Sequence, residues 1–375
     1  MSDNELSKQR IAFIAGTLGQ GGAEKQLYHL LQILTGEGVK CAVFSLTKGE
    51  YWEEKIRELG VPVIYCGGNG TKISRFISLL RAVTAFQATI IQSQHFYTNL
   101  YAITLSLLTK AIAIGAVRSE LQAEIQNCGY IIGFLNLYCP SYLFINSRSS
   151  FTKVINKKHH NKKSFFLPNV VDVDFYKQCQ KSNTGTFTLL AVGRFSEEKR
   201  YDRILDIYVN LTNEVKSKAR VILAGTGPLK YDLMDKARKY GLNRNRCIFT
   251  GNYTDTVELY KSADVYLLTS QYEGMPNVVM EAMACGLPVV ATAAGDTPEL
   301  FPPELRWLVI DPYSPDAFVS VLEKLYHNPD LRLEIGRKLR NYIVDHHSLE
   351  VLRPRIIETY RSVCTGGKHR IDTAA

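Results

Sequence analysis

The sequence predicts an α/β protein of two domains, each built on a doubly wound parallel sheet. Short apolar runs alternate with helical stretches along the chain, which is the pattern of repeated β-α-β units. Glycine-rich loops follow apolar runs in both halves of the chain. A length of 375 residues is large for one hydrophobic core and comfortable for two.

The first domain is assigned to residues 1–170. Its first strand is expected at Ile11–Ala15, followed by a glycine-rich loop and a helix from about Ala23. Further apolar runs predict strands at Cys41–Leu46, Val61–Tyr65, Thr89–Gln92, Ala111–Val117 and Leu143–Asn146.

The second domain is assigned to residues 185–348, after a polar linker at Lys177–Gly185. Strands are expected at Phe187–Val192, Val221–Ala224, Cys247–Thr250, Val265–Ser270 and Val289–Thr292. One helix is expected at Tyr201–Val215, and three more close the chain at about Pro315–Leu325, Asp330–Val344 and Leu349–Val363. Residues 365–375 have the composition of a frayed tail.

The stretch Tyr272–Gly286 carries the clearest functional pattern. A buried strand ends in a Gly/Pro loop, Pro276 suits the first turn of a helix, and a helix follows from Asn277 to Ala284. This order places unpaired N–H groups and the positive end of a helix dipole at the carboxyl edge of a parallel sheet. Anions bind at such an edge.

Two carboxylates frame this anion site, Glu273 in the loop and Glu281 about one turn inside the helix. A carboxylate accepts paired hydrogen bonds from a vicinal diol, so the arrangement suits a sugar–phosphate ligand. Spacing alone leaves a second reading open, in which Glu273 complements the helix dipole and Glu281 is a solvated helix residue.

The stretch resembles the Glu-x7-Glu signature of retaining glycosyltransferases of the family 4 type. The flanking pieces EGMPN and EAMACGLPVVAT agree with it. The resemblance implies a GT-B fold, two Rossmann-like domains facing a cleft. It also implies that Glu273 contacts the transferred sugar and that Glu281 holds the ribose. The donor-binding backbone would be that of Gly274, Met275, Pro276, Asn277 and Val278.

Other motifs extend the resemblance over almost the whole chain. The piece GRFSEEK resembles the family's pyrophosphate clamp, which assigns Arg194 and Lys199 to the diphosphate. The GGAE turn resembles the loop over the donor phosphates and assigns Gly21 and Gly22, although its spacing is neither GxGxxG nor a Walker A loop. The resemblance also implies that Asn252 and Tyr253 contact the nucleotide base of the donor.

A catalytic histidine is less clearly placed. Family members often carry His-x-His where this chain has Gln92-Ser93-Gln94, with His95 one residue further on. Either His95 takes over after a small loop shift, or Gln94 acts as a neutral hydrogen-bond donor. A lone histidine at a strand end also fits a structural role.

The resemblance implies a retaining hexosyltransferase of polysaccharide biosynthesis, which moves a hexose from a UDP-sugar to a glycan or lipid-linked glycan. Glucose is the first expectation. The donor would bind the second domain and the acceptor the first, with the helix at about 349–375 packing back on the first domain. No Asp-x-Asp motif stands near the site, so neither a metal nor another cofactor is expected, and cationic groups would stabilise the leaving diphosphate.

Two alternatives stay open. One is a catalytically weak accessory subunit that keeps the nucleotide site. The other is a nicotinamide-dependent oxidoreductase, which would need a GxGxxG loop that this chain lacks.

Composition bears on location and on further partners. Eight scattered cysteines and the absence of a visible signal peptide indicate a reducing cytoplasm. Residues 1–180 carry 19 Lys/Arg and 12 Asp/Glu, a surplus of 7 within the total of +9, much of it at Lys153–Lys163. Residues 129–145 favour a buried helix running into a strand, with an interfacial element as the alternative. A peripheral contact with an anionic membrane is therefore expected, and nucleic acid is not.

Overall fold

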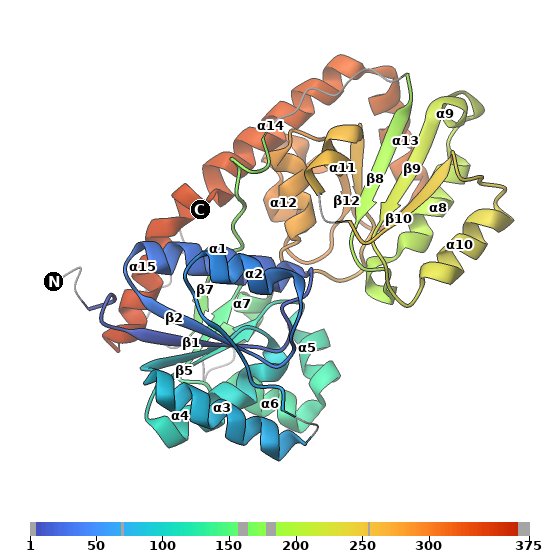
Figure 1. Cartoon of the computed structure of the whole chain (residues 1–375). Helices are drawn as coiled ribbons and strands as arrows, with labels where there is room; N and C mark the ends of the chain where they lie inside the picture. The colour runs from blue at the N-terminus through green and yellow to red at the C-terminus, as the bar shows by residue number, and fades with distance from the viewer. Residues whose placement is uncertain (1–4, 69–70, 157–163, 178–184, 254–255, 367–375) are drawn as a thin grey trace. The chain divides into compact units, whose positions relative to one another are not determined.

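The computed structural model describes residues 5–68, 71–156, 164–177, 185–253 and 256–366 (Figure 1). The chain divides into two compact units, which are described separately. Unit 1 is Met1–Val170 with Leu352–Ala375, and unit 2 is Val171–Val351. Most of the expected linker at Lys177–Gly185 and of the expected tail at 365–375 lies outside the described residues.

Unit 1 is built on a seven-stranded sheet in the order β3-β2-β1-β4-β5-β6-β7, with every pair parallel. The strands are β1 (Arg10–Ala15), β2 (Lys40–Ser45), β3 (Val63–Tyr65), β4 (Ile90–Ser93), β5 (Ile112–Val117), β6 (Tyr142–Ile145) and β7 (Ser164–Phe166). The central strands are buried on both faces, which explains why they read as continuous apolar runs.

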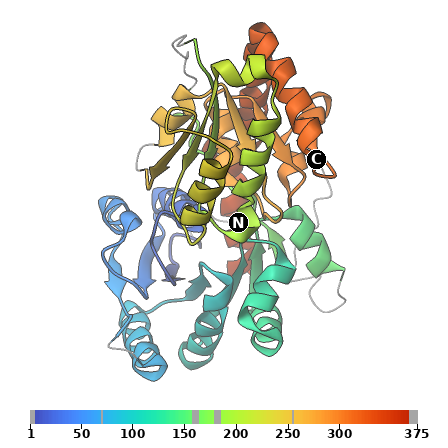
Figure 2. The same ribbon diagram turned by 90° about the vertical axis from the view of Figure 1, so that its right-hand side faces the viewer.

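Helices cover both faces of this sheet. They are α1 (Gly22–Gly36), α2 (Tyr51–Glu58), α3 (Lys72–Phe86), η1 (Phe96–Thr98), α4 (Asn99–Thr109), α5 (Leu121–Cys128), α6 (Tyr130–Tyr138), α7 (Arg148–Ile155) and α15 (Leu349–Cys364). Figure 1 shows α1, α2 and α15 above the sheet and α3, α4 and α6 below it, and Figure 2 shows the lower helices in the same row. Residues such as Ile14, Phe44, Leu79 and Val83 form the core on the α3 side.

The last helix, α15, packs on unit 1. The Tyr360 ring meets Phe144 edge to face at 5.4 Å between centroids, and its hydroxyl donates to the buried Gln92 side chain. The Arg355 guanidinium donates to the Phe166 carbonyl at 3.1 Å.

Unit 2 is built on a six-stranded parallel sheet in the order β10-β9-β8-β11-β12-β13. Its strands are β8 (Phe187–Val192), β9 (Ala219–Ala224), β10 (Cys247–Gly251), β11 (Val265–Leu268), β12 (Val289–Thr292) and β13 (Val309–Ile310). Its helices are η2 (Glu197–Lys199), α8 (Tyr201–Asn210), α9 (Asn213–Lys218), α10 (Lys230–Lys239), α11 (Thr256–Ser262), α12 (Asn277–Ala284), η3 (Thr297–Leu300), η4 (Pro303–Leu308), α13 (Pro315–His327) and α14 (Pro329–His347). The two parallel sheets confirm the predicted α/β fold class.

Two local predictions for unit 2 are wrong. The helix expected at Tyr201–Val215 is broken, because Leu211 is extended and buried and the Thr212 N–H donates to Glu323 at 2.7 Å instead of continuing α8. Pro276 does not lie in the first turn of α12. It is the N-cap residue, with extended backbone, and the helix begins at Asn277.

The favoured prediction for residues 129–145 is half wrong. A helix and a strand form, α6 and then β6, but α6 is not buried. Tyr130, Ile131 and Phe134 are 75%, 80% and 59% exposed. Only a narrow strip around Gly133 faces inward, and a β-carbon there would lie 2.9 Å from the Ile125 side chain. In the described part of the chain, no helix is long and apolar enough to cross a membrane.

Candidate functional site

The carboxyl ends of the unit 2 strands gather most of the predicted donor-binding residues at one edge of the sheet. Arg194 follows β8, Asn252 and Tyr253 follow β10, and Glu273 follows β11. Strands β8 and β11 are neighbours in the sheet although β9 and β10 separate them in the sequence. Ligands of open parallel sheets bind at such a reversal of strand order.

The loops after β8 and β11 are tied to each other by backbone contacts. Thr269 Oγ1 donates to the Arg200 carbonyl at 2.9 Å, and the Gln271 N–H donates to the Glu198 carbonyl at 2.7 Å. The Arg203 guanidinium donates to the Thr269 carbonyl at 3.1 Å. Lys199 is thereby held beside the start of the Glu273 loop.

Lys199 and Glu273 form an ion pair with 2.7 Å between Nζ and Oε1. Ser270 Oγ donates to the same carboxylate oxygen at 2.7 Å. Within the residues that the structure describes, no bond to Oε2 is recorded. Glu273 is 8% exposed and sits before α12, whose first turn holds no acid. Among the described residues its partners are therefore Lys199 and Ser270, both on the same oxygen, which leaves the other oxygen for a ligand hydroxyl.

The loop that carries Glu273 depends on a glycine in a neighbouring loop. Gly295 has φ +56°, and a β-carbon there would lie 2.2 Å from the Glu273 carbonyl oxygen and 2.6 Å from that of Gly274. The Asp296 N–H donates to the same Gly274 carbonyl at 2.9 Å. The close backbone approach after β12 therefore fixes the shape of the 273–276 loop.

Glu281 lies inside α12 and is 3% exposed, so it is not the solvated glutamate of the alternative reading. Tyr260 donates its hydroxyl to Glu281 Oε2 at 2.9 Å and approaches the Val278 carbonyl at 3.4 Å. Burial, with the nearby Glu281 carboxylate, raises the pKa of Tyr260 well above its ordinary value, so the phenol remains a donor. Tyr260 was missed from the sequence, because nothing in the pattern around it marks a contact 21 residues away.

The start of α12 brings the positive end of a helix dipole to this edge. Gly274, Met275 and Pro276 are buried, and Asn277 and Val278 are half-buried. The Pro276 carbonyl accepts from the N–H groups of the third and fourth helical residues, Val279 and Met280, which begins the helical hydrogen bonding. The helix dipole favours an anion here.

The other predicted donor residues are placed at the same edge without mutual contacts. The Arg194 side chain is exposed, and no bond of its guanidinium is recorded in the described part of the chain. The backbone just before Arg194 packs closely against Gly225. A β-carbon at Gly225 would lie 1.9 Å from the Gly193 carbonyl oxygen. Asn252 and Tyr253 are exposed, and residues 254–255 after them are outside the description.

In unit 1, Gly21 and Gly22 lie at the junction of the first loop and α1, as the N-cap and the first helical residue. Glu50 anchors the loop before them. Its carboxylate accepts from Thr17 Oγ1 at 2.9 Å and from the Leu18 N–H. Burial raises the pKa of Glu50, but hydrogen bonds from Thr47, Leu18 and Thr17 outweigh it and lower the pKa below its ordinary value. Nothing in the residues around Glu50 indicates this role from the sequence alone.

Gln94 and His95 have different surroundings at the end of β4. Gln94 is completely buried and donates to the Ala23 carbonyl at 2.5 Å, so it has no surface for a substrate. His95 Nδ1 accepts from the Gly16 N–H at 3.3 Å, which places the proton on Nε2, 3.0 Å from Glu24 Oε1. The ring stacks on Tyr97 and stays 12% exposed. Of the two, only His95 has surface for a ligand, although both of its nitrogens have protein partners.

Metal-ligating side chains are not gathered anywhere in the described residues: no group of three or more His, Cys, Asp or Glu could hold a metal ion there. Metal independence remains a prediction.

Comparisons with known proteins follow the same division of the chain. Residues 172–342 match the family described as Glycosyl transferases group 1. The amylovoran biosynthesis glycosyltransferase AmsD of Erwinia amylovora is 32% identical over 144 residues, 38% of this chain and 40% of that protein. The Vi polysaccharide biosynthesis protein VipC/TviE of Salmonella typhi is 26% identical over 199 residues, 52% of this chain and 34% of that protein. The chain thus spans less than half the length of these two relatives.

Whole-chain similarity is seen in solved structures. Anabaena Alr3699/HepE, solved in complex with UDP-glucose, superposes with a TM-score of 0.82 at 18% identity and covers 94% of this chain and 99% of that one. At this identity the likeness shows the fold. Residues 172–342 are thus similar to the Glycosyl transferases group 1 family, and the chain has the GT-B fold.

Proposed function

We propose that the protein is a retaining hexosyltransferase, which moves a hexose from a UDP-sugar to a glycan or lipid-linked glycan acceptor in polysaccharide biosynthesis. The observation that carries the proposal is the Lys199–Glu273 pair, which leaves a carboxylate oxygen beside the start of α12. The family match of unit 2 supports transfer of a glycosyl group, and the names of AmsD and VipC/TviE support polysaccharide as the product class.

The donor would be held by complementary groups at the edge of the unit 2 sheet. Glu281, oriented by Tyr260, would accept the ribose hydroxyls, and Glu273 would accept a sugar hydroxyl. Lys199, Arg194 and the positive end of the α12 dipole would face the diphosphate. UDP-glucose is the first donor to test, since HepE binds it on the same fold.

The chemical step would use these charges to stabilise the leaving group. The acceptor oxygen forms a bond to the anomeric carbon while the bond from that carbon to the β-phosphate oxygen breaks. The electron pair leaves with UDP, and the acceptor proton passes to a phosphate oxygen on the same face, which retains the configuration. The fixed cations and dipole need no reorganisation as charge develops on the diphosphate.

Unit 1 would bind the acceptor, and His95, Gly21 and Gly22 are its candidate residues for substrate contact. A UDP-sugar and a lipid-linked glycan meet at the cytoplasmic face of a membrane, which is where we place the activity. The nicotinamide-dependent alternative has no support, because neither glycine loop has the GxGxxG spacing.

The test is proton NMR of UDP-glucose incubated with the protein, with and without EDTA. We expect slow release of UDP with α-glucose as the first anomer, at the same rate in EDTA. Release of β-glucose would contradict retention, and loss of activity in EDTA that Mg²⁺ or Mn²⁺ restores would contradict metal independence.

One observation favours the accessory-subunit candidate. Both ring nitrogens of His95 already have protein partners, Gly16 and Glu24. A protein that binds UDP by calorimetry but neither hydrolyses UDP-glucose nor transfers glucose to any glycan acceptor would support that candidate over the enzyme.

A further inference from the structure

The outer side of the helix layer α3, α4 and α6 exposes an unusual amount of apolar surface. We call it the α3–α4–α6 face. Its exposed large hydrophobic residues are Ile73, Ile77, Leu107, Leu108, Tyr130, Ile131, Ile132, Phe134 and Leu135. The three helices lie side by side below the unit 1 sheet in Figures 1 and 2. Apolar residues gathered in this way mark an interaction surface.

The helix α6 contributes the largest share. None of its nine residues is charged, and Tyr130, Ile131, Phe134 and Leu135 follow the spacing of one helical face. The opposite face packs inward through Gly133 and Leu137. Because Gly133 is on the side of α6 that packs against unit 1, the large apolar side chains point outward. Packing within unit 1 therefore leaves this apolar face exposed.

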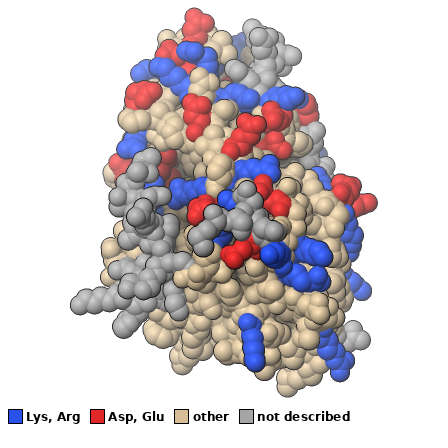
Figure 3. All heavy atoms as spheres, turned by 90° about the vertical axis from the view of Figure 1, so that its left-hand side faces the viewer, with Lys and Arg blue, Asp and Glu red and all other residues tan. Residues whose placement is uncertain are grey.

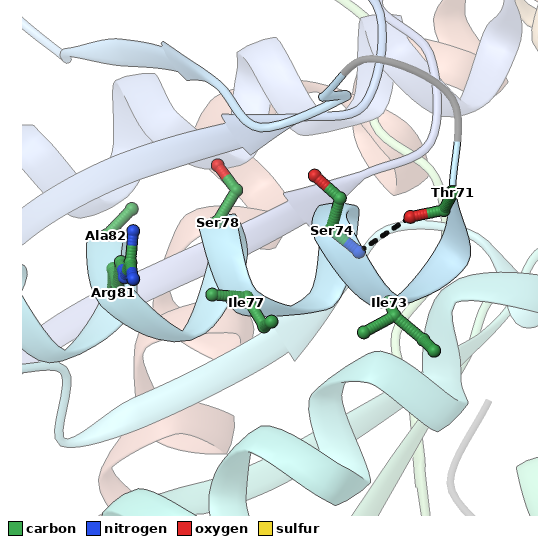
Figure 4. A pocket seen from close by; sticks show the side chains of 7 residues that line it. All are labelled: Thr71, Ile73, Ser74, Ile77, Ser78, Arg81 and Ala82. Carbon is green, nitrogen blue, oxygen red and sulfur yellow. Dashed lines mark hydrogen bonds between the residues drawn. The ribbon is translucent and has the colours of Figure 1, made fainter.

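A groove along α3 continues this surface. It has a volume of about 750 Å³, and its lining includes Ile73, Ile77, Ser78 and Arg81 (Figure 4). Figure 4 shows the two isoleucines directed to the same side of the helix, while Ser74 and Ser78 point to the other. The Arg81 guanidinium lies one helical turn beyond the Ile77 side chain. This arrangement suits a phospholipid, with the isoleucines against the acyl chain and the guanidinium at the phosphate.

The part of the sequence that contains this face is rich in cations. Residues 59–171 contain 11 Lys/Arg and 2 Asp/Glu, a surplus of 9 that equals the net charge of the whole chain. The other residues therefore hold 34 of each sign. The sequences of α3, α4 and α6 contain no acid, and Lys72, Arg81 and Lys110 are exposed on or directly after these helices. Figure 3 views the molecule from the left-hand side of Figure 1, and its lowest part shows isolated blue side chains on a largely tan surface.

We propose that the α3–α4–α6 face docks on an anionic phospholipid bilayer. The apolar side of α6 would enter the boundary between headgroups and acyl chains, and Lys72, Arg81 and Lys110 would lie among the phosphates. A second copy of the chain fits less well, because a two-fold contact through this face would bring cations against cations with no acid to pair them. Docking on a bilayer would bring the protein to the lipid-linked acceptor of the proposed function, on which this inference rests. The docking itself does not require catalysis.

The test is flotation of the full chain with vesicles of phosphatidylcholine alone or with phosphatidylglycerol added. We expect binding only to the anionic vesicles at 0.1 M salt and release at 1 M, as the Debye length falls from about 10 Å to about 3 Å. Protein that stays unbound at low salt, or that binds neutral vesicles equally well, would overturn the proposal.

Matched variants locate the surface. Ile131→Ser with Phe134→Ser should lower the apparent partition coefficient at least tenfold, and so should Lys72→Gln with Arg81→Gln and Lys110→Gln. The controls lie in unit 2 at similar exposure: Tyr231→Ser with Leu333→Ser, and Lys218→Gln with Arg238→Gln and Lys239→Gln. Equal losses in variants and controls would contradict the assignment of the face.

Two further readouts keep the result unambiguous. Circular dichroism and UDP binding should be unchanged in every variant, because all the altered side chains are exposed and none belongs to the donor site. Sedimentation velocity tests the second-copy alternative: a dimer that the α6 variant turns into a monomer, without vesicle binding by the parent, would replace the membrane proposal. Vesicle binding without turnover would support the surface and contradict only the proposed function.

Discussion

Lys199 Nζ lies 2.7 Å from Glu273 Oε1, although the two residues are 74 positions apart in the sequence. The pair joins the loop after β8 to the loop after β11, at the reversal of strand order in the unit 2 sheet. The cation that we propose for the diphosphate and the carboxylate that we propose for the sugar are thus held together by a direct ion pair.

Glu273→Gln should lower turnover of UDP-glucose by 10- to 100-fold and leave UDP affinity within about threefold. The amide keeps the shape but loses a charge-assisted bond, which contributes about 1.5–3 kcal/mol. Steady-state kinetics with calorimetry of UDP separate the two effects. A loss of UDP affinity as large as the loss of turnover would place Glu273 in nucleotide binding instead.

Tyr260→Phe should weaken UDP binding up to about tenfold, because the buried Glu281 carboxylate loses a donor that orients it. The matched control is Tyr208→Phe, which removes a buried hydroxyl bonded to the Ala219 carbonyl at 2.8 Å, at the opposite end of the sheet. Both variants should lose some stability, but only Tyr260→Phe should alter calorimetric UDP affinity. Equal affinities in the two variants would show that Tyr260 is structural.

Gly295→Ala should abolish most turnover, since the new β-carbon would meet the Glu273 and Gly274 carbonyl oxygens. The control is Gly241→Ala. That glycine has φ +70°, so the backbone strain is comparable at about 1–2 kcal/mol, but no atom lies within 4 Å of the new β-carbon. Thermal unfolding should show a loss from backbone strain in both variants and a further loss in Gly295→Ala from the clash with the two carbonyl oxygens. Normal turnover in Gly295→Ala would mean that the 273–276 loop does not need this support.

Glu50→Gln should destabilise the protein at pH 7 and matter progressively less as the solution is acidified. Because the folded-state pKa of Glu50 is lowered, its contribution is present above the ordinary carboxyl pKa and is lost as the pH falls through the folded value. The melting temperatures of parent and variant from pH 7 to pH 3 measure the gap. Glu54→Gln, an exposed change in the helix α2 that follows Glu50, serves as control, and a gap that widens in acid would contradict the account.

Regular elements were predictable where burial dictates the sequence. The apolar run Phe187–Val192 is β8 to the residue, and the predicted helix from Asn277 to Ala284 is α12 with both ends correct. A strand covered on both faces must be apolar throughout, so its pattern is independent of distant partners.

The rest depended on partners that the sequence does not reveal. The break after α8 depends on Glu323, whose carboxylate accepts a hydrogen bond from the Thr212 N–H. The two residues are 111 positions apart in the sequence. The orientation of α6 could not be read from an apolar run, since hydrophobic periodicity does not tell a buried face from one that meets another surface. Tyr260, Glu24 and Glu50 were missed for the same reason, because each acts on a side chain or loop far from it in the sequence.

The central claim is that unit 2 binds a uridine nucleotide through Glu281, with Lys199 and Arg194 on the diphosphate. Calorimetric titration of UDP into the parent protein and into Glu281→Ala tests it most directly. We expect the parent to bind and the variant to bind at least tenfold more weakly, because a carboxylate–hydroxyl interaction contributes about 1.5–3 kcal/mol. Equal affinity for UDP in the two proteins would contradict the claim.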